Sequence, residues 1–189
     1  MRKAADSGHR RAQFNVAQFI TARRPTWASF KEALPLYQSA AEAGIPDAQY
    51  ALANIYAEAK GVAFGDDNKA RGWLEKAARG GLGAAQVDLG IWLANGRGGA
   101  KDVVQARQWF VRAAVQRNRV AQNRLARIYA YGSGVKADPI LGSAWHIVSR
   151  RAGFSDTELD RFFQSLEEID RKRALEAANQ LSRRLDIAN

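Results

Sequence analysis

The sequence predicts an all-α fold, a right-handed α/α solenoid of helix-turn-helix repeats that ends in a C-terminal helical cap. Three tryptophans stand 36 residues apart, at Trp73, Trp109 and Trp145. Four Ala-Gln pairs recur at steps of 36, 37 and 36 residues, beginning at Ala12, Ala48, Ala85 and Ala121. A fixed period of this length is typical of stacked repeats, in which each hairpin buries its apolar face against its neighbours.

The first helix of each repeat, helix A, is predicted from an apolar stripe that follows the Ala-Gln pair. After Ala48, the residues at i+4, i+7 and i+8 are Leu52, Ile55 and Tyr56. The same spacing recurs in the next two repeats, as Leu89, Trp92 and Leu93 and as Leu125, Ile128 and Tyr129. This spacing places the side chains along one face of a helix.

A glycine-rich turn and an aspartate are expected to separate helix A from the second helix, helix B. The turns read Lys60-Gly61-Val62, Arg97-Gly98-Gly99 and Ser133-Gly134-Val135. Glycine ends helices because it tolerates the left-handed conformation. Asp138-Pro139 reads as an N-cap followed by proline at the first helical position, and Asp66 or Asp67 and Asp102 are expected to cap in the same way.

The first repeat departs from this pattern, and the array has predicted limits. Its turn, residues 21–26, contains no glycine, and Pro35 lies inside its helix B, where we expect a kink. The segment 1–8 aligns with the end of a helix B, so the chain is expected to begin inside a repeat. The predicted organisation is a partial repeat end at 1–8, repeats at about 12–44, 48–81, 85–118 and 121–153, and a cap at 154–189.

Composition excludes several kinds of protein. The 189 residues include no cysteine, which excludes disulfides and thiolate metal sites. No run of about 18 apolar residues exists, so no membrane span is expected. The net charge of +10 is uneven, because residues 101–153 carry 10 basic and 2 acidic residues. Such a block favours acidic partners, anionic lipid headgroups or nucleic acid.

The full motif resembles the Sel-one-like repeat family, α/α relatives of tetratricopeptide repeats. It reads A-Q-x-x-L-[AG]-x-x-[YL], a glycine turn, Asp, and then A-R-x-W-x-x-[KR]-A-A, and the resemblance covers residues 3 to about 153. It implies an adaptor that holds partner proteins without catalysis of its own. Because bacterial members are often periplasmic or secreted, these locations are favoured over the cytoplasm. Ser149-Arg150 replaces the small pair that should follow Trp145, which predicts that stacking ends there.

The groove along the A helices is the predicted binding surface, because partner contacts should lie where the repeat varies. The three tryptophans are expected to pack between repeats instead. By analogy with tetratricopeptide repeats, row one of the groove is Phe14, Tyr50, Val87 and Asn123. Row two is Gln18, Asn54, Ile91 and Arg127, with Glu58, Asn95 and Tyr131 one turn further. An exposed apolar strip of this kind is typical of a site for a protein or peptide, although some of these residues are equally expected to pack against the neighbouring helix.

A basic cluster offers an alternative function. Arg117, Arg119, Arg124 and Arg127 lie close to row two and are expected either to hold a carboxylate or to form a solvated helix face. On this alternative the protein is an electrostatic binder of an anionic polymer (nucleic acid, acidic glycan or lipid headgroups) through residues 101–153. Nucleic acid is the less favoured polymer, because no nucleic-acid motif is found and exposed aromatics do not alternate with these arginines.

No catalytic, metal or cofactor site is expected. The chain has two histidines, His9 and His146, and His146 follows Trp145 inside helix B, where a structural role is favoured. Gly96-Arg97-Gly98-Gly99 lacks the preceding strand and the following Lys-Ser/Thr of a phosphate loop. No Ser-His-Asp set and no metal-ligand spacing is found. The sequence therefore predicts a non-catalytic protein.

Overall fold

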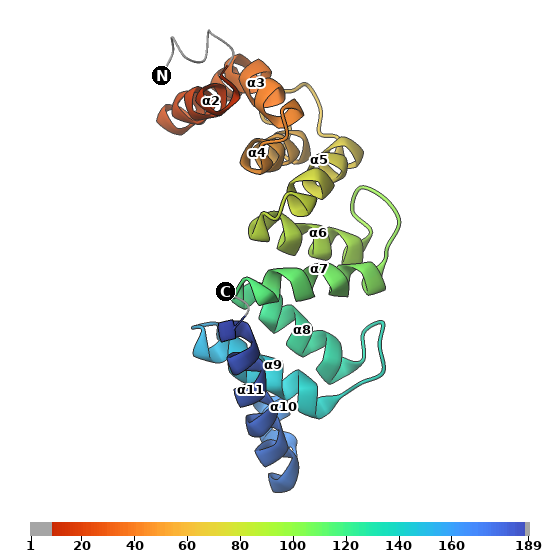
Figure 1. Cartoon of the computed structure of the whole chain (residues 1–189). Coiled ribbons are helices and arrows are strands. Elements are labelled where there is room, and N and C mark those ends of the chain that lie inside the picture. The colour runs from red at the N-terminus through yellow and green to blue at the C-terminus, as the bar shows by residue number, and fades with distance from the viewer. Residues whose placement is uncertain (1–8, 188–189) are drawn as a thin grey trace. The chain divides into compact units, whose positions relative to one another are not determined.

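The computed structural model describes residues 9–187, and all regular secondary structure in that range is helical. The helices are α2 (Arg10–Arg23), α3 (Trp27–Glu42), α4 (Pro46–Ala57), α5 (Asp67–Arg79), α6 (Gly83–Asn95), α7 (Val103–Val115), α8 (Arg119–Tyr131), α9 (Pro139–Arg151), α10 (Thr157–Ser165) and α11 (Glu168–Ile187) (Figure 1). The predicted all-α repeat fold is confirmed. The predicted repeat end at residues 1–8 lies outside the described residues.

The chain divides into two compact units, one extending to Lys101 and the other beginning at Asp102. In unit 1, each helix from α2 to α5 packs against the next one along the chain. In unit 2, α8 packs against both α7 and α9, and α9 also contacts α10 and α11. Helices α2, α4, α6 and α8 are the predicted A helices, and α3, α5, α7 and α9 are the B helices.

Small residues allow the helices of a repeat to approach closely. The alanine that opens each Ala-Gln pair in α4, α6 and α8 is fully buried, and so is the leucine four residues later. A buried leucine of this kind stabilises a fold by about 2–5 kcal/mol relative to alanine. The repeated sequence positions are therefore the core positions, as predicted.

The glutamine of the Ala-Gln pair ties helix A to the helix B before it. In unit 1, Nε2 of Gln49 donates to the carbonyl of Ala41 at 3.1 Å, and Nε2 of Gln86 donates to that of Ala78 at 3.2 Å. In unit 2, Gln122 donates to Ala114 at 3.4 Å. The last carbonyls of a helix have no partner inside it. Each of the three carbonyls accepts one hydrogen bond from a backbone N–H of the following turn. The buried glutamine supplies a second hydrogen bond and thereby fixes the corner between two repeats.

Aspartates begin most of the later helices, as predicted. The carboxylates of Asp66, Asp102 and Asp138 accept a hydrogen bond from the backbone N–H three residues on, at 2.8–2.9 Å. Each bond satisfies one of the free N–H groups in the first turn. Helix α3 has a different start, a capping box between Thr26 and Ser29, and it runs through Pro35 without interruption.

The tryptophans differ in burial. Trp109 and Trp145 are buried, as predicted, whereas Trp73 is half-buried. A cation from the same helix lies over the ring in two cases, with Lys76 Nζ at 3.8 Å from Trp73 and the Arg112 guanidinium at 4.4 Å from Trp109. These cation–π contacts use ring faces that the packing leaves accessible.

Helices α10 and α11 form the C-terminal cap. Leu159 of α10 is buried, and Ala174, Ala178 and Leu185 form the buried side of α11, which packs on α9. No helix in the described part of the chain is both long and apolar enough to cross a membrane.

Candidate partner-binding surface

Row one of the predicted groove is mostly packed inside the molecule. Phe14, Val87 and Asn123 are buried, and Tyr50 is half-buried. The ring of Phe14 lies edge-on to Tyr37 of α3, with centroids 6.1 Å apart. The expectation that this row is an exposed strip is therefore wrong for these three residues, because helical periodicity does not reveal which side chains a neighbouring helix covers.

Tyr50 joins two consecutive A helices of unit 1. Its hydroxyl on α4 donates to Oδ2 of Asp88 on α6 at 2.6 Å. Burial, followed by the nearby Asp88 carboxylate, raises the pKa of Tyr50 to about 12. The phenol therefore stays protonated at neutral pH and acts as a donor that holds α4 to α6.

The same kind of contact joins α2 to α4. Nη1 of Arg11 lies 3.3 Å from Oδ2 of Asp47 in an exposed ion pair. In both contacts of unit 1 the earlier A helix supplies the donor and the later A helix supplies the carboxylate. The A helices of this unit are thus linked by polar side chains on the face that was predicted to form the groove.

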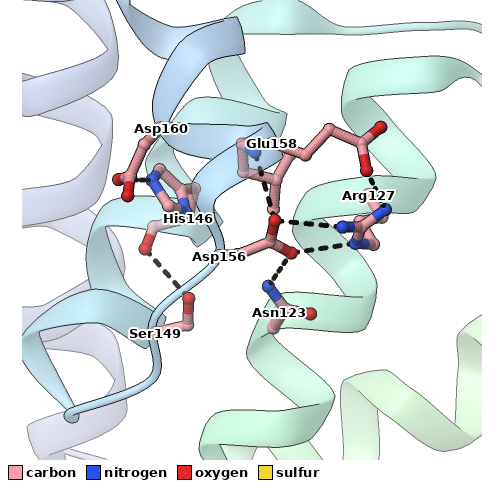
Figure 2. Close-up of polar contacts among 8 residues, drawn as sticks. Asn123, Arg127, His146, Ser149, Asp156, Glu158 and Asp160 are labelled. Atoms are coloured by element: carbon pink, nitrogen blue, oxygen red, sulfur yellow. Dashed lines mark hydrogen bonds and ion pairs between the residues drawn. The ribbon is translucent and has the colours of Figure 1, made fainter.

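In unit 2 this arrangement extends into the cap. The carboxylate of Asp156, which caps α10, accepts hydrogen bonds from Nδ2 of Asn123 at 2.8 Å and from Nε and Nη2 of Arg127 at 2.9 and 3.0 Å (Figure 2). Nη1 of Arg127 reaches Glu158 at 2.9 Å. Further along α8, the ring of Tyr131 meets Phe162 edge-on at 5.5 Å.

This network sets the charge of Asp156. Burial alone would raise the pKa of its carboxyl, but the hydrogen bonds from Asn123 and Arg127 outweigh burial and lower the pKa to about 2. Asp156 therefore stays ionised and keeps the guanidinium of Arg127 paired. The α8 members of the predicted site, Asn123, Arg127 and Tyr131, are in this way engaged by α10.

Row two remains accessible in unit 1. Gln18, Glu58 and Asn95 are exposed, and Asn54 and Ile91 are half-buried. We call these five residues the unit 1 A face. They come from α2, the end of α4 and α6, and they combine amide groups, one carboxylate and one apolar side chain. Such a surface can hydrogen-bond a peptide backbone around an apolar contact.

The predicted basic cluster does not act as one free patch. Arg117 pairs with Asp186 of α11, and Arg127 pairs with Asp156 and Glu158. Arg119 and Arg124 are exposed. Two of the four guanidiniums are thus neutralised by the cap.

His146 contributes to the join between α9 and the cap. Its buried ring places Nε2 2.9 Å from Oδ1 of Asp160 (Figure 2). Arg150 pairs with the same carboxylate. Oγ of Ser149 donates to the His146 backbone carbonyl at 2.9 Å. The group has the arrangement of a structural contact between α9 and α10. Among the described residues, no cluster of three His, Cys, Asp or Glu side chains is placed to hold a metal ion.

Sequence reasoning missed the carboxylates that receive these contacts. Asp47 and Asp88 lie 36 and 38 residues after their donors, and Asp156 lies 33 residues after Asn123 and 29 residues after Arg127. For Asp47 and Asp88 the separation is close to one repeat, so a donor and an acid near matching A-helix positions are the signal that would have identified these two pairs. Asp156 lies beyond the repeats, at the start of α10, where this signal does not apply.

Comparison with known proteins agrees with this architecture. Residues 25–45, 46–82, 83–116 and 119–147 match the Sel1 repeat. The structure is similar to that of a Sel1 repeat protein from Oxalobacter formigenes, with a TM-score of 0.73 and 26% identity over 95% of this chain and 76% of that chain. It is also similar to c5321, a protective antigen present in uropathogenic Escherichia coli strains that displays an SLR fold, with a TM-score of 0.58, 25% identity and coverage of 97% and 48%.

A curated relative is the chitin synthase regulator SKT5 of Malassezia restricta. It is 30% identical over 107 residues, which cover 54% of this chain and 7% of the relative. The chain thus spans a small part of that protein's length. Since the matched repeats cover more than half of the sequence, the chain belongs to the Sel1 repeat family.

Proposed function

We propose that this protein is a non-catalytic scaffold that binds a partner protein or peptide through the unit 1 A face. Sel1 repeats form a scaffold family that typically mediates protein interactions. The observation that carries the choice of surface is a contrast between repeats. On α8 the groove positions Asn123, Arg127 and Tyr131 contact α10, whereas Gln18, Asn54 and Ile91 in unit 1 remain accessible.

The chemistry of the unit 1 A face suits a peptide backbone. Asn95 offers an amide donor and acceptor, and Ile91 offers an apolar contact. The side-chain amide of Asn54 contacts the Tyr50 hydroxyl and presents its remaining hydrogen-bonding capacity to a partner. The hydrogen bond between Tyr50 and Asp88 holds α4 to α6 and so fixes the positions of the side chains on this face. A partner would thus meet a preorganised surface, which reduces the entropy lost on binding.

The experiment is selective capture followed by direct binding. The double variant Asn54→Glu/Ile91→Glu places charge on the accessible face, and Ala28→Glu/Asn68→Glu places the same charge on exposed positions at the start of α3 and α5. A partner captured from the source organism, then purified, should bind the wild type and the control pair with equal affinity. We expect the Asn54/Ile91 variant to lose at least tenfold in affinity with an unchanged circular dichroism melt. Equal binding by all three proteins would rule out this face.

The anionic-polymer alternative rests on the positive charge of residues 101–153. Its support is the exposure of Arg119 and Arg124, and it is weakened by the ion pairs of Arg117 and Arg127. A salt titration separates the two functions. Polymer binding should weaken steeply between about 50 and 200 mM salt because counterions are released, whereas a peptide held by amides and Ile91 should respond weakly.

We also propose a periplasmic or secreted location. The support is the similarity to the uropathogenic E. coli protein, which is described as a protective antigen. Cell fractionation of the source organism with an antibody against the chain tests this proposal. Recovery with cytoplasmic markers would contradict it.

A further inference from the structure

A cleft of about 720 Å³ opens between α2 and α3 at the beginning of unit 1. Val16, Phe19 and Ile20 of α2 give it an apolar lining, and Arg23, Arg24 and Glu32 line it with charge. This cleft is separate from the unit 1 A face, which uses Gln18 on the same helix. It combines an apolar surface with two adjacent guanidiniums.

One residue of the apolar lining, Phe19, is exposed, whereas Val16 is buried. Phe19 is 65% exposed, whereas Ile55, at the same position of the next repeat, is 2% exposed. Ile55 belongs to a core cluster with Tyr37, Ala40 and Ala41 of the preceding helix B. In the next repeat the preceding helix B thus covers this position, whereas the aromatic side chain of Phe19 is exposed.

The turn of the first repeat differs in sequence from the later turns of unit 1. In the later repeats of unit 1, the turn glycine touches the start of the preceding helix B. A Cβ at Gly61 would lie 2.4 Å from the backbone nitrogen of Lys31, and one at Gly98 would lie 2.3 Å from the carbonyl oxygen of Asp67. The first repeat carries Arg23-Arg24-Pro25 in this region instead. The cleft therefore differs in shape and charge from the contacts that join the repeats.

The charges at the cleft favour an acidic ligand. Within residues 9–187, neither Arg23 nor Arg24 forms an ion pair, and Glu32 is the single acidic side chain that lines the cleft. Two cations against one carboxylate leave a net positive site. Guanidiniums bind carboxylates through paired, charge-assisted hydrogen bonds, so an acidic group next to an apolar one would satisfy both parts of the cleft.

The molecule contains an internal example of this chemistry. Arg127 and Tyr131 of α8 bind the start of α10 through Asp156, Glu158 and Phe162. In that contact Arg127 pairs with the two carboxylates, and the ring of Tyr131 packs edge-on against Phe162. The cleft offers the same pair of functions, with Arg23 and Arg24 as cations and Phe19 as the ring.

We propose that this cleft binds a segment of a partner protein in which an aromatic or large aliphatic side chain lies beside carboxylates. The apolar side chain packs on Val16, Phe19 and Ile20. The carboxylates pair with Arg23 and Arg24. The ligand is thus an acidic peptide segment with a large apolar side chain, and it binds a different surface from the one proposed for the main partner.

The probe is a fluorescein-labelled peptide with the sequence of residues 154–166, which contains Asp156, Glu158, Phe162 and Phe163. Fluorescence anisotropy measures its binding to the full chain. We expect Phe19→Ser and Arg23→Glu/Arg24→Glu each to weaken binding at least tenfold. The charge-matched control Arg79→Glu/Lys101→Glu, at exposed positions of unit 1, should bind as the wild type does. A peptide with lysine in place of its acidic residues should not bind.

Further variants separate this site from the others. Arg127→Met tests whether the probe instead replaces α10 in its contact with α8. Asn54→Glu/Ile91→Glu tests whether the probe binds the unit 1 A face. Both variants should bind the probe with unchanged affinity. Loss of binding in either variant, or equal binding of the lysine peptide, would overturn the proposal. A photo-crosslinker at Phe19 that links only to residues 1–8 would also overturn the proposal, because the chain itself would then occupy the cleft. Self-association that light scattering detects and that Phe19→Ser abolishes would overturn it too, because a second copy would then occupy the cleft.

Discussion

The carboxylate of Asp156 accepts two hydrogen bonds from one guanidinium, that of Arg127, at 2.9 and 3.0 Å. Arg127 is on α8 in the last matched repeat, and Asp156 is the N-cap of α10. The pair therefore joins the repeats of unit 2 to the cap. It also explains why a residue predicted for partner binding has an internal role.

Removing the guanidinium should loosen the cap. We expect Arg127→Met to lower the free energy of unfolding by about 1.5–3 kcal/mol, because the carboxylate of Asp156 loses charge-assisted hydrogen bonds while remaining mostly buried. Urea unfolding measures the change. Arg124→Met, three residues earlier on α8 and exposed, is the matched control and should stay within about 0.5 kcal/mol of the wild type. Equal effects would show that the pair adds nothing beyond a surface charge.

The same pair predicts a dependence of stability on acid. The pKa of Asp156 is about 2 in the folded chain and about 3.8 without the network. Its stabilising contribution is therefore fully present above pH 4 and is lost as the pH falls toward 2. Comparison of urea midpoints should show a steeper loss between pH 4 and 2 for the wild type than for Asp156→Asn. A carboxyl carbon of Asp156 that titrates near pH 4 by NMR would contradict the prediction.

The sequence was sufficient for the repeat fold because the repeat marks each buried position several times. Leu52 and Leu89 recur at one repeat's separation and are both fully buried, and Asp102 and Asp138 recur before their helices and both cap them. When the same residue type recurs at equivalent positions of successive repeats, those positions share the same structural environment. Burial and capping are properties of one repeat, so they could be predicted without knowing the neighbours.

The candidate site was harder to predict because it depends on contacts between repeats. Asn123 has the spacing of a groove residue, yet it is 3% exposed because Asp156 of the cap covers it. The repeat stops before Asp156, so no register carries from α8 into α10. Phe14 and Val87 show the related problem, since a 3.6-residue period defines a face of a helix but does not reveal how much of that face the adjacent helix covers.

The hydrogen bond between Tyr50 and Asp88 predicts an alkaline dependence. The pKa of Tyr50 is raised to about 12, so its folded form keeps a proton that the unfolded chain loses near pH 10. The associated stability is present below pH 10 and is lost as the pH rises toward 12. Tyr50→Phe should remove this part of the slope, which urea midpoints at pH 9, 10 and 11 would measure. The difference from the wild type isolates Tyr50 from the other tyrosines. An identical slope in both proteins would show that the phenol ionises normally.

The close contact between Gly61 and α3 should be measurable as a larger loss of stability for Gly61→Ala than for Gly44→Ala. Gly61 and Gly44 both have left-handed backbone, with φ of +72° and +84°, but only Gly61 is crowded. Gly44→Ala should cost about 1–2 kcal/mol for backbone strain alone. Gly61→Ala should cost about 1–3 kcal/mol more, because its Cβ would meet the backbone nitrogen of Lys31 at 2.4 Å and the first turn region of α3 would have to move. Thermal and urea unfolding of the two variants give the difference directly. Since the backbone penalty is common to both, equal costs would mean that the turn and α3 do not approach closely in solution.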